Sequence, residues 1–219
     1  GRLEAPGQVT AIAFSPDAAQ IACGTSANVL RVLDVKDGKE VFDAKAPGTV
    51  RGAGWLGAKR AVFLADKAKK SVLVDVDVPK NKSAVVAVPL ATRLVTCGKW
   101  LATAGERSAA IHDSKLAPKL EVETDEPILD LAIENDKSLV LRCAERLQRV
   151  KLGGKSPRFD DIRRGPAGGL AASGKRIYAL FADTLVRFHT DEAASVVTSV
   201  HQNHVCGIRR LPDGRLLTN

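Results

Sequence analysis

Residues 9–44 read VTAIAFSPDAAQIACGTSANVLRVLDVKDGKEVFDA, and four short apolar runs within this stretch decide the fold. The runs lie at 9–14, 20–24, 29–34 and 41–44, and each has the length of a β-strand. They are rich in β-branched residues and are separated by segments containing proline, aspartate and glycine, which favour turns. This pattern predicts four consecutive strands rather than a helix.

The same unit recurs along the whole chain. Turns followed closely by a strand occur at intervals of 38 to 41 residues, and no stretch of ten or more residues has helical periodicity. The turns are centred on Ala18, Gly57, Gly98, Asp136, Gly174 and Gly214. Four strands in about 40 residues, repeated, are the signature of a β-propeller blade. We therefore predict an all-β protein, a β-propeller of four-stranded antiparallel blades.

The repeats resemble those of the WD40 family. Phe14-Ser15-Pro16-Asp17 matches the family's turn, and Leu33-Asp34 and His112-Asp113 stand where many members have Trp-Asp. The Gly-His pair that precedes the first strand in the family is absent from the repeats, apart from His204 near the end. The polar network of strong WD40 blades is therefore expected to be missing, and apolar packing is expected to hold the blades instead.

The repeat length predicts one propeller over residues 1–219, with five complete blades and partial blades at both ends. The expected blades are 7–46, 48–89, 90–126, 127–165 and 166–203, with an incomplete blade at 204–219. At this period six blades need about 235 residues and seven about 275. We expect this chain to be part of a longer protein, or a partner to supply what is missing.

Composition limits the setting and the partners. The chain has 219 residues, a formal net charge of +8 and four cysteines scattered singly. Single cysteines without a signal-peptide pattern favour a reducing compartment, cytoplasmic or nuclear. No apolar run reaches the length of a transmembrane helix. The net charge permits an anionic partner without demonstrating one.

Two motifs resemble ligand-binding sites, a phosphate-binding loop and a zinc site, and each lacks a residue that the site requires. Gly153-Gly154-Lys155-Ser156 is similar to the end of a phosphate-binding loop, but Arg149 replaces the required glycine and Pro157 follows. His201, His204 and Cys206 give three ligands where zinc needs four. We therefore predict no enzyme activity, no cofactor and no bound metal.

Ile162-Arg163-Arg164-Gly165 resembles the Phe-Arg-Arg-Gly motif of phosphoinositide-binding propellers. Paired arginines can hold phosphates through their planar guanidinium groups. An alternative function follows: an anion-binding propeller that contacts phosphoinositide membrane or RNA through Arg163, Arg164 and a basic rim.

The WD40 resemblance implies a noncatalytic scaffold for protein–protein interaction in a larger multidomain protein or complex, such as the recognition module of a signalling protein. Its partners would be other proteins or other domains of the same protein. In the family's layout, the loops joining strands two and three, and strands four and one, share one face. The candidate partner-binding residues on these loops and near the chain's end are Lys67, Lys69, Lys70, Glu106, Arg107, Glu145, Arg146, Arg163, Arg164, His201 and His204.

Overall fold

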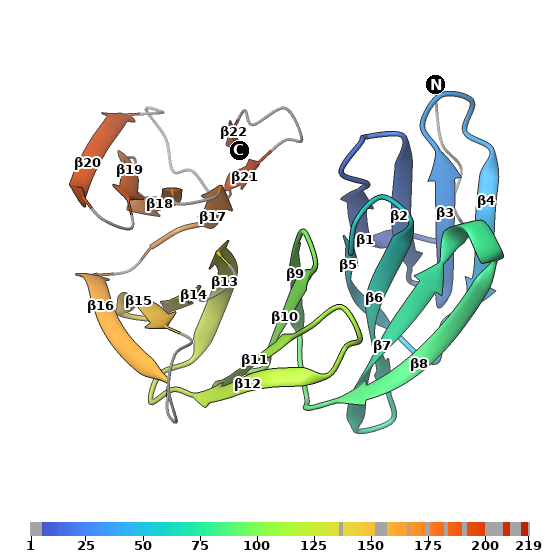
Figure 1. Cartoon of the computed structure of the whole chain (residues 1–219), viewed down its shortest axis with the longest axis horizontal. Helices are drawn as coiled ribbons and strands as arrows, with labels where there is room; N and C mark the ends of the chain where they lie inside the picture. Colours follow the sequence, from blue (N-terminus) through green and yellow to red (C-terminus); the bar gives the residue numbers. More distant parts are fainter. Residues whose placement is uncertain are drawn as a thin grey trace. The chain divides into compact units, whose positions relative to one another are not determined.

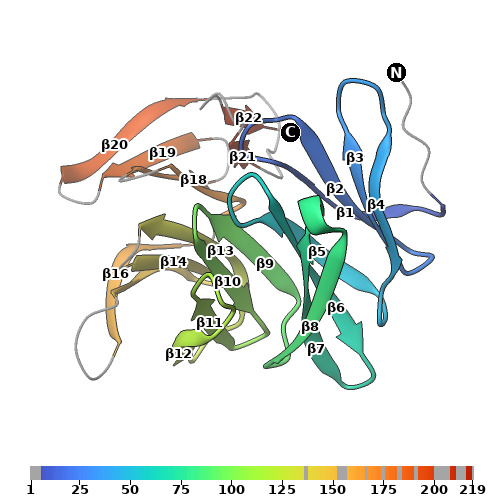
Figure 2. The ribbon, with the colours of Figure 1, turned by 45° about the vertical axis from the view of Figure 1, so that its right-hand side comes forward.

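The computed structural model describes most of the chain as antiparallel strands (Figures 1 and 2), and a 3-10 turn lies at Val78–Lys80. The described residues are 6–135, 138–151, 157–165, 167–173, 176–181, 184–189, 192–199, 208–210 and 216–218. The predictions for the phosphate-loop-like segment 153–156 and for His201, His204 and Cys206 lie outside these residues.

The chain divides into two compact units, which we describe separately. The first comprises Gly1–Gly105 and Ala109–Lys119, and the second comprises Glu106–Ser108 and Leu120–Asn219.

The first unit holds two complete sheets and most of a third. The first sheet is β1 (Val9–Phe14), β2 (Gln20–Thr25), β3 (Val29–Asp34) and β4 (Glu40–Lys45). The second is β5 (Val50–Trp55), β6 (Arg60–Lys67), β7 (Lys70–Asp77) and β8 (Lys82–Val88). The third is β9 (Arg93–Cys97), β10 (Trp100–Ala104), β11 (Ser108–His112) and β12 (Pro118–Glu123), and the division between the units passes through it.

The second unit holds two four-stranded sheets and a hairpin. One sheet is β13 (Ile128–Asn135), β14 (Ser138–Cys143), β15 (Arg146–Lys151) and β16 (Arg158–Arg164). The other is β17 (Leu170–Ser173), β18 (Arg176–Phe181), β19 (Thr184–His189) and β20 (Glu192–Ser199). The hairpin pairs β21 (Ile208–Arg210) with β22 (Leu216–Thr218).

The four-strand prediction is confirmed in these sheets, and so are three of the predicted turns. Ala18, Gly57 and Gly98 have φ angles of 56°, 70° and 59°, in the left-handed region that reverses the chain between strands. The remaining predicted turn centres, Asp136, Gly174 and Gly214, lie outside the described residues.

Burial follows the position of a strand in its sheet. Residues 61–65 of β6 are all buried, because β6 is an inner strand covered on both faces. On the outer strand β4, buried and exposed positions are interspersed. This difference explains why β6 appears in the sequence as an unbroken apolar run and β4 as a mixed one.

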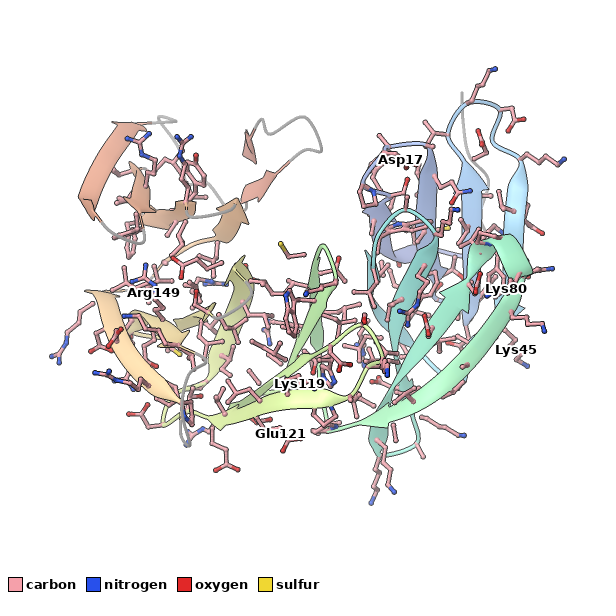
Figure 3. The ribbon with its side chains drawn as sticks, in the orientation of Figure 1. Asp17, Lys45, Lys80, Lys119, Glu121 and Arg149 are labelled. Carbon is pink, nitrogen blue, oxygen red and sulfur yellow. The ribbon has the colours of Figure 1, made fainter. Side chains whose placement is uncertain are left out.

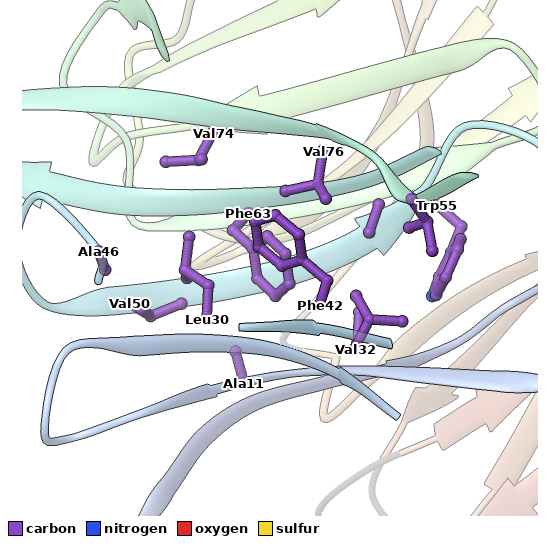
Figure 4. Packing of buried hydrophobic residues seen from close by; sticks show 13 residues of the cluster. Ala11, Leu30, Val32, Phe42, Ala46, Val50, Trp55, Phe63, Val74 and Val76 are labelled. Carbon is purple, nitrogen blue, oxygen red and sulfur yellow. The ribbon is translucent and has the colours of Figure 1, made fainter. Parts of the chain in front are cut away.

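Neighbouring sheets of the first unit pack face to face. Leu30 and Phe42 of the first sheet meet Phe63 and Val76 of the second in one buried cluster (Figure 4). The strand β5 lies between β1 and β9. A Cβ atom on Gly54 would stand 2.5 Å from Thr96 Cγ2, so the close approach of β5 to β9 requires glycine.

Polar contacts also connect these sheets, in addition to the apolar packing. The indole Nε1–H of Trp55 donates to the Ala13 carbonyl at 3.1 Å, which joins β5 to β1. The Trp55 backbone N–H donates to Thr96 Oγ1 at 3.2 Å, which joins β5 to β9. These bonds use a tryptophan on a first strand, where the family pattern gives no reason to look for it.

The second unit repeats the arrangement with its own core. Leu147 of one sheet packs in a buried cluster with Leu170, Ile177 and Phe188 of the next. The first strands again lie side by side, β13 next to β17 and β17 next to β21.

Candidate interaction surface

Three chain segments meet at one end of the β13–β16 sheet, all within the second unit. The Ile128 N–H donates to the Glu106 carbonyl at 2.6 Å, and the Thr124 N–H donates to the Arg107 carbonyl at 2.9 Å. The loop 124–127 is thereby held against the turn that carries Glu106 and Arg107. The Glu145 N–H donates to Glu126 Oε2 at 3.0 Å, which adds the β14–β15 turn. We call these segments the loop cluster.

The end of β16 joins the same cluster. The Gly165 N–H donates to the Glu145 carbonyl at 2.7 Å, and Arg164 stands opposite Arg146 in the ladder between β15 and β16. Five of the candidate residues from distant parts of the sequence are therefore brought together: Glu106, Arg107, Glu145, Arg146 and Arg164.

The guanidinium group of Arg146 is already occupied. Its Nη2 contacts Asp125 Oδ1, its Nε lies 3.0 Å from Glu126 Oε1, and its side chain is only 19% exposed. The hydrogen bond from Arg146 lowers the pKa of the Asp125 carboxyl below its ordinary value. Arg146 therefore fixes the loop 124–127 in place and offers little charge to a partner.

The remaining charges of the cluster face solvent. Glu106, Arg107 and Glu145 are exposed. The side chain of Arg164 is 87% exposed, and Asp161 Oδ2 lies 3.8 Å from its Nε. Arg163 pairs through its backbone with Leu147, and its side chain lies outside the described part of the structure. The cluster thus presents charges of both signs on loops fixed by hydrogen bonds.

The three candidate lysines lie elsewhere, in the first unit. Lys67, Lys69 and Lys70 are exposed on the turn between β6 and β7, where Ala68 has a φ of 56°. The structure therefore separates the predicted surface into two groups, one on each unit.

A buried ion pair lies within the β13–β16 sheet, toward the end opposite the loop cluster, and sequence reasoning missed it. Glu134 on β13 is fully buried, and Arg149 on β15, labelled in Figure 3, holds its carboxylate with two contacts of 2.9 and 3.0 Å. The Ser138 hydroxyl of β14 donates to the same carboxylate. The available signal was a glutamate at the end of the apolar run of β13.

Two side chains of reactive types, Cys143 and His112, are buried inside their sheets. Burial raises the pKa of the Cys143 thiol to about 11, which keeps it protonated at neutral pH. His112 is 1% exposed, with Thr103 Oγ1 3.1 Å from its Nε2 and the Leu116 carbonyl 3.3 Å from its Nδ1.

Within the described residues, no group of three or more His, Cys, Asp or Glu side chains is placed to hold a metal ion. Helices of a length and apolarity suited to spanning a membrane are likewise absent from that part of the chain.

Comparison with known proteins gives a match of structure only. No family model matches the sequence, and no curated protein matches it. The chain is similar to the solved structure of the Cps50 (Swd1) β-propeller domain from Myceliophteria thermophila, with a TM-score of 0.69 and 14% identity. The match covers 95% of this chain and 79% of that one. Together with the four-stranded antiparallel sheets, it shows that the chain has a β-propeller fold.

Proposed function

We propose that this protein is a noncatalytic scaffold that binds other proteins, or other domains of its own protein, through the loop cluster of the second unit. The observation that carries the proposal is the hydrogen-bonded joining of the 106–107 turn, the loop 124–127 and the 145–146 turn. Loops that are ordered before binding lose less conformational entropy when a partner docks. Charges of both signs at the rim select among partners rather than attracting every polyanion.

The double variant Glu106→Lys with Arg107→Glu tests this proposal. It reverses two exposed charges without changing the net charge and leaves the backbone bonds of the turn available. A matched control, Glu121→Lys with Arg158→Glu, makes the same exchange at exposed positions on the outer strands β12 and β16. The measurement is crosslinking of the intact protein in its native cells, with the crosslinked partners quantified by mass spectrometry. We expect the first variant to yield about tenfold less crosslinked partner than the natural protein. An exposed charge pair contributes about 0.2–1 kcal/mol to binding, and reversing the charges adds repulsion.

The control should retain the partners of the natural protein, and both variants should have its circular dichroism spectrum. An identical partner set in the natural protein and in the loop-cluster variant would contradict the proposal, because it would place the binding surface elsewhere.

The alternative function, binding of RNA or phosphoinositide membrane through Arg163 and Arg164, has one supporting observation. The Arg164 side chain is 87% exposed, and among the residues that the structure describes its carboxylate neighbour is Asp161, at 3.8 Å. Vesicle flotation and an RNA shift assay with Arg164→Glu test it, and unchanged binding of both polyanions would exclude a role for Arg164.

We further propose a cytoplasmic or nuclear location. The support is that the described cysteines, Cys23, Cys97 and Cys143, form no disulfide with one another.

A further inference from the structure

The turn between β6 and β7 in the first unit concentrates positive charge. Lys67, Lys69 and Lys70 are all exposed within four residues. Among the described residues, no carboxylate lies within ion-pair distance of these three side chains. By contrast, Arg60 and Lys80, near the opposite ends of β6 and β7, each pair with an aspartate at 2.7 Å.

The base of this turn is held by the loop that precedes β5. The Asp66 N–H donates to the Thr49 carbonyl at 2.9 Å. A Cβ atom on Gly48 would stand 1.9 Å from the Asp66 carbonyl oxygen, so the loop can lie this close only because residue 48 is glycine. Arg51 Nε pairs with Asp66 Oδ2 at 2.9 Å, which compensates the negative charge nearest to the lysines.

The loop that precedes β9 holds the other side of the turn. The Ser71 hydroxyl accepts the Ala91 N–H at 2.9 Å and donates to the Ala91 carbonyl at 3.0 Å, and both residues are buried. The preceding residue, Leu90, is 64% exposed. Arg93, two residues after Ala91, donates to the Thr92 hydroxyl at 3.1 Å. The exposed Leu90 therefore belongs to a loop that is hydrogen-bonded to β7 at the residue after Lys70, and Arg93 begins the strand that follows this loop.

We define the basic patch as Lys67, Lys69, Lys70 and Arg93 together with Leu90. We propose that the basic patch binds an acidic segment of a partner protein, whose carboxylates face the four cations and whose apolar side chain covers Leu90. This inference rests on the proposed function as a protein-binding scaffold and names the chemistry of one partner.

Three features of the patch favour a peptide over a nucleic acid. Leu90 finds no complementary group on a phosphate backbone, whereas a peptide can place an apolar side chain among carboxylates. The patch also contains no aromatic side chain on which a base could stack. Three of its four cations are lysines, which attract carboxylates as point charges without the fork geometry that arginine offers to phosphate.

The test measures fluorescence anisotropy of a labelled peptide of glutamates with one central leucine. A second peptide carries serine in place of that leucine. We expect the triple variant Lys67→Glu, Lys69→Glu, Lys70→Glu to bind the leucine peptide at least about tenfold more weakly than the natural protein. The matched control Lys36→Glu, Lys39→Glu, Lys59→Glu changes the net charge equally at exposed turns of the same unit and should change binding less than about twofold.

Leu90→Ser should weaken binding of the leucine peptide about threefold or more and leave the serine peptide unchanged. Equal losses with the two lysine triples would overturn the proposal in favour of attraction by overall charge. Tighter binding of a DNA duplex or of phosphatidylserine vesicles than of the leucine peptide would overturn it in favour of those ligands. Failure of the peptide to bind at low ionic strength would also overturn it.

The loop-cluster variant Glu106→Lys with Arg107→Glu separates this inference from the proposed function. It should bind the leucine peptide as the natural protein does, because neither residue belongs to the basic patch. The lysine triple variant tests only the basic patch, through peptide binding. The loop-cluster variant tests only the proposed function, through cellular partners, so either proposal can fail while the other stands.

Discussion

Glu134 places a buried carboxylate inside the β13–β16 sheet, and its neighbours compensate the cost of burying that charge. Arg149 contacts both carboxylate oxygens, and Ser138 donates to one of them. The Arg149 side chain is only 12% exposed, so it too depends on the pair. Removing one partner of a buried pair leaves the other charge uncompensated, which costs more than the intact pair contributes.

We expect Glu134→Ala to lower the free energy of unfolding by about 3–5 kcal/mol, because Arg149 would be left buried without its counter-charge. Urea unfolding followed by circular dichroism measures this. Replacing Glu134 and Arg149 together by leucine and methionine should cost less than the single change. For comparison, Lys80→Ala removes an exposed pair and should change the free energy of unfolding far less than Glu134→Ala does. Similar losses for Glu134→Ala and Lys80→Ala would refute the account of the buried pair.

At the scale of the element, most inner strands are apolar along much of their length, and several of the polar side chains on them are buried as well. The strand β14 is buried at every position except Arg142, and Cys143 at its end is completely buried. The third-sheet strand β9 differs, because Cys97 at its end is exposed. The same residue type therefore has different chemistry according to its place in a sheet.

We expect iodoacetamide at pH 8 to modify Cys97 and to spare Cys143 in the folded protein, as read by peptide mass spectrometry. Burial raises the pKa of Cys143 from 9.0 to about 11, so the folded state keeps a proton that the unfolded state loses. Stability from this group is therefore present below pH 9 and is lost as the pH rises toward 11. Cys143→Ala should show a shallower decline of unfolding free energy over this interval, and an unchanged slope would contradict the raised pKa.

At the scale of the whole molecule, hydrogen-bonded carboxylates occur in both units. The pKa of Asp17 is lowered by the Ser15 hydroxyl, that of Asp77 by Lys80, and that of Asp125 by Arg146. A hydrogen bond from Lys151 lowers the pKa of Asp160 in the same way. A lowered carboxyl pKa contributes stability above the ordinary value of 3.8, and this contribution is lost as the pH falls through the folded-state value.

We expect the urea midpoint of the natural protein to vary little between pH 7 and pH 5 and to fall below pH 4. Asp125→Asn should lower the midpoint at pH 7, where the carboxylate is charged, and its difference from the natural protein should shrink at pH 2 to 3. The reason is that protonation removes the same charge from Asp125 that the substitution removes. A difference that stays constant over the whole range would argue against the pairing of Asp125 with Arg146.

The amino-acid sequence by itself determined the strands, the turns and the four-strand repeat. These features depend on local properties: strand-length apolar runs mark each strand, and Ala18, Gly57 and Gly98 mark chain reversals that adopt positive φ. The sequence also located the turns that carry Lys67, Glu106 and Glu145. It therefore indicated where charged loops lie but gave no account of their partners.

Only the tertiary structure decided which charges are paired and which face solvent. Arg146 meets Asp125 twenty-one residues away, and Arg149 meets Glu134 fifteen residues away. Such distances depend on sheet register and on the path of connecting loops, which no local pattern encodes. The sequence placed the lysines of the β6–β7 turn among the candidate partner-binding residues, but it did not indicate whether a carboxylate would pair with them. Their lack of a carboxylate partner within the described residues follows from the arrangement of three loops in space.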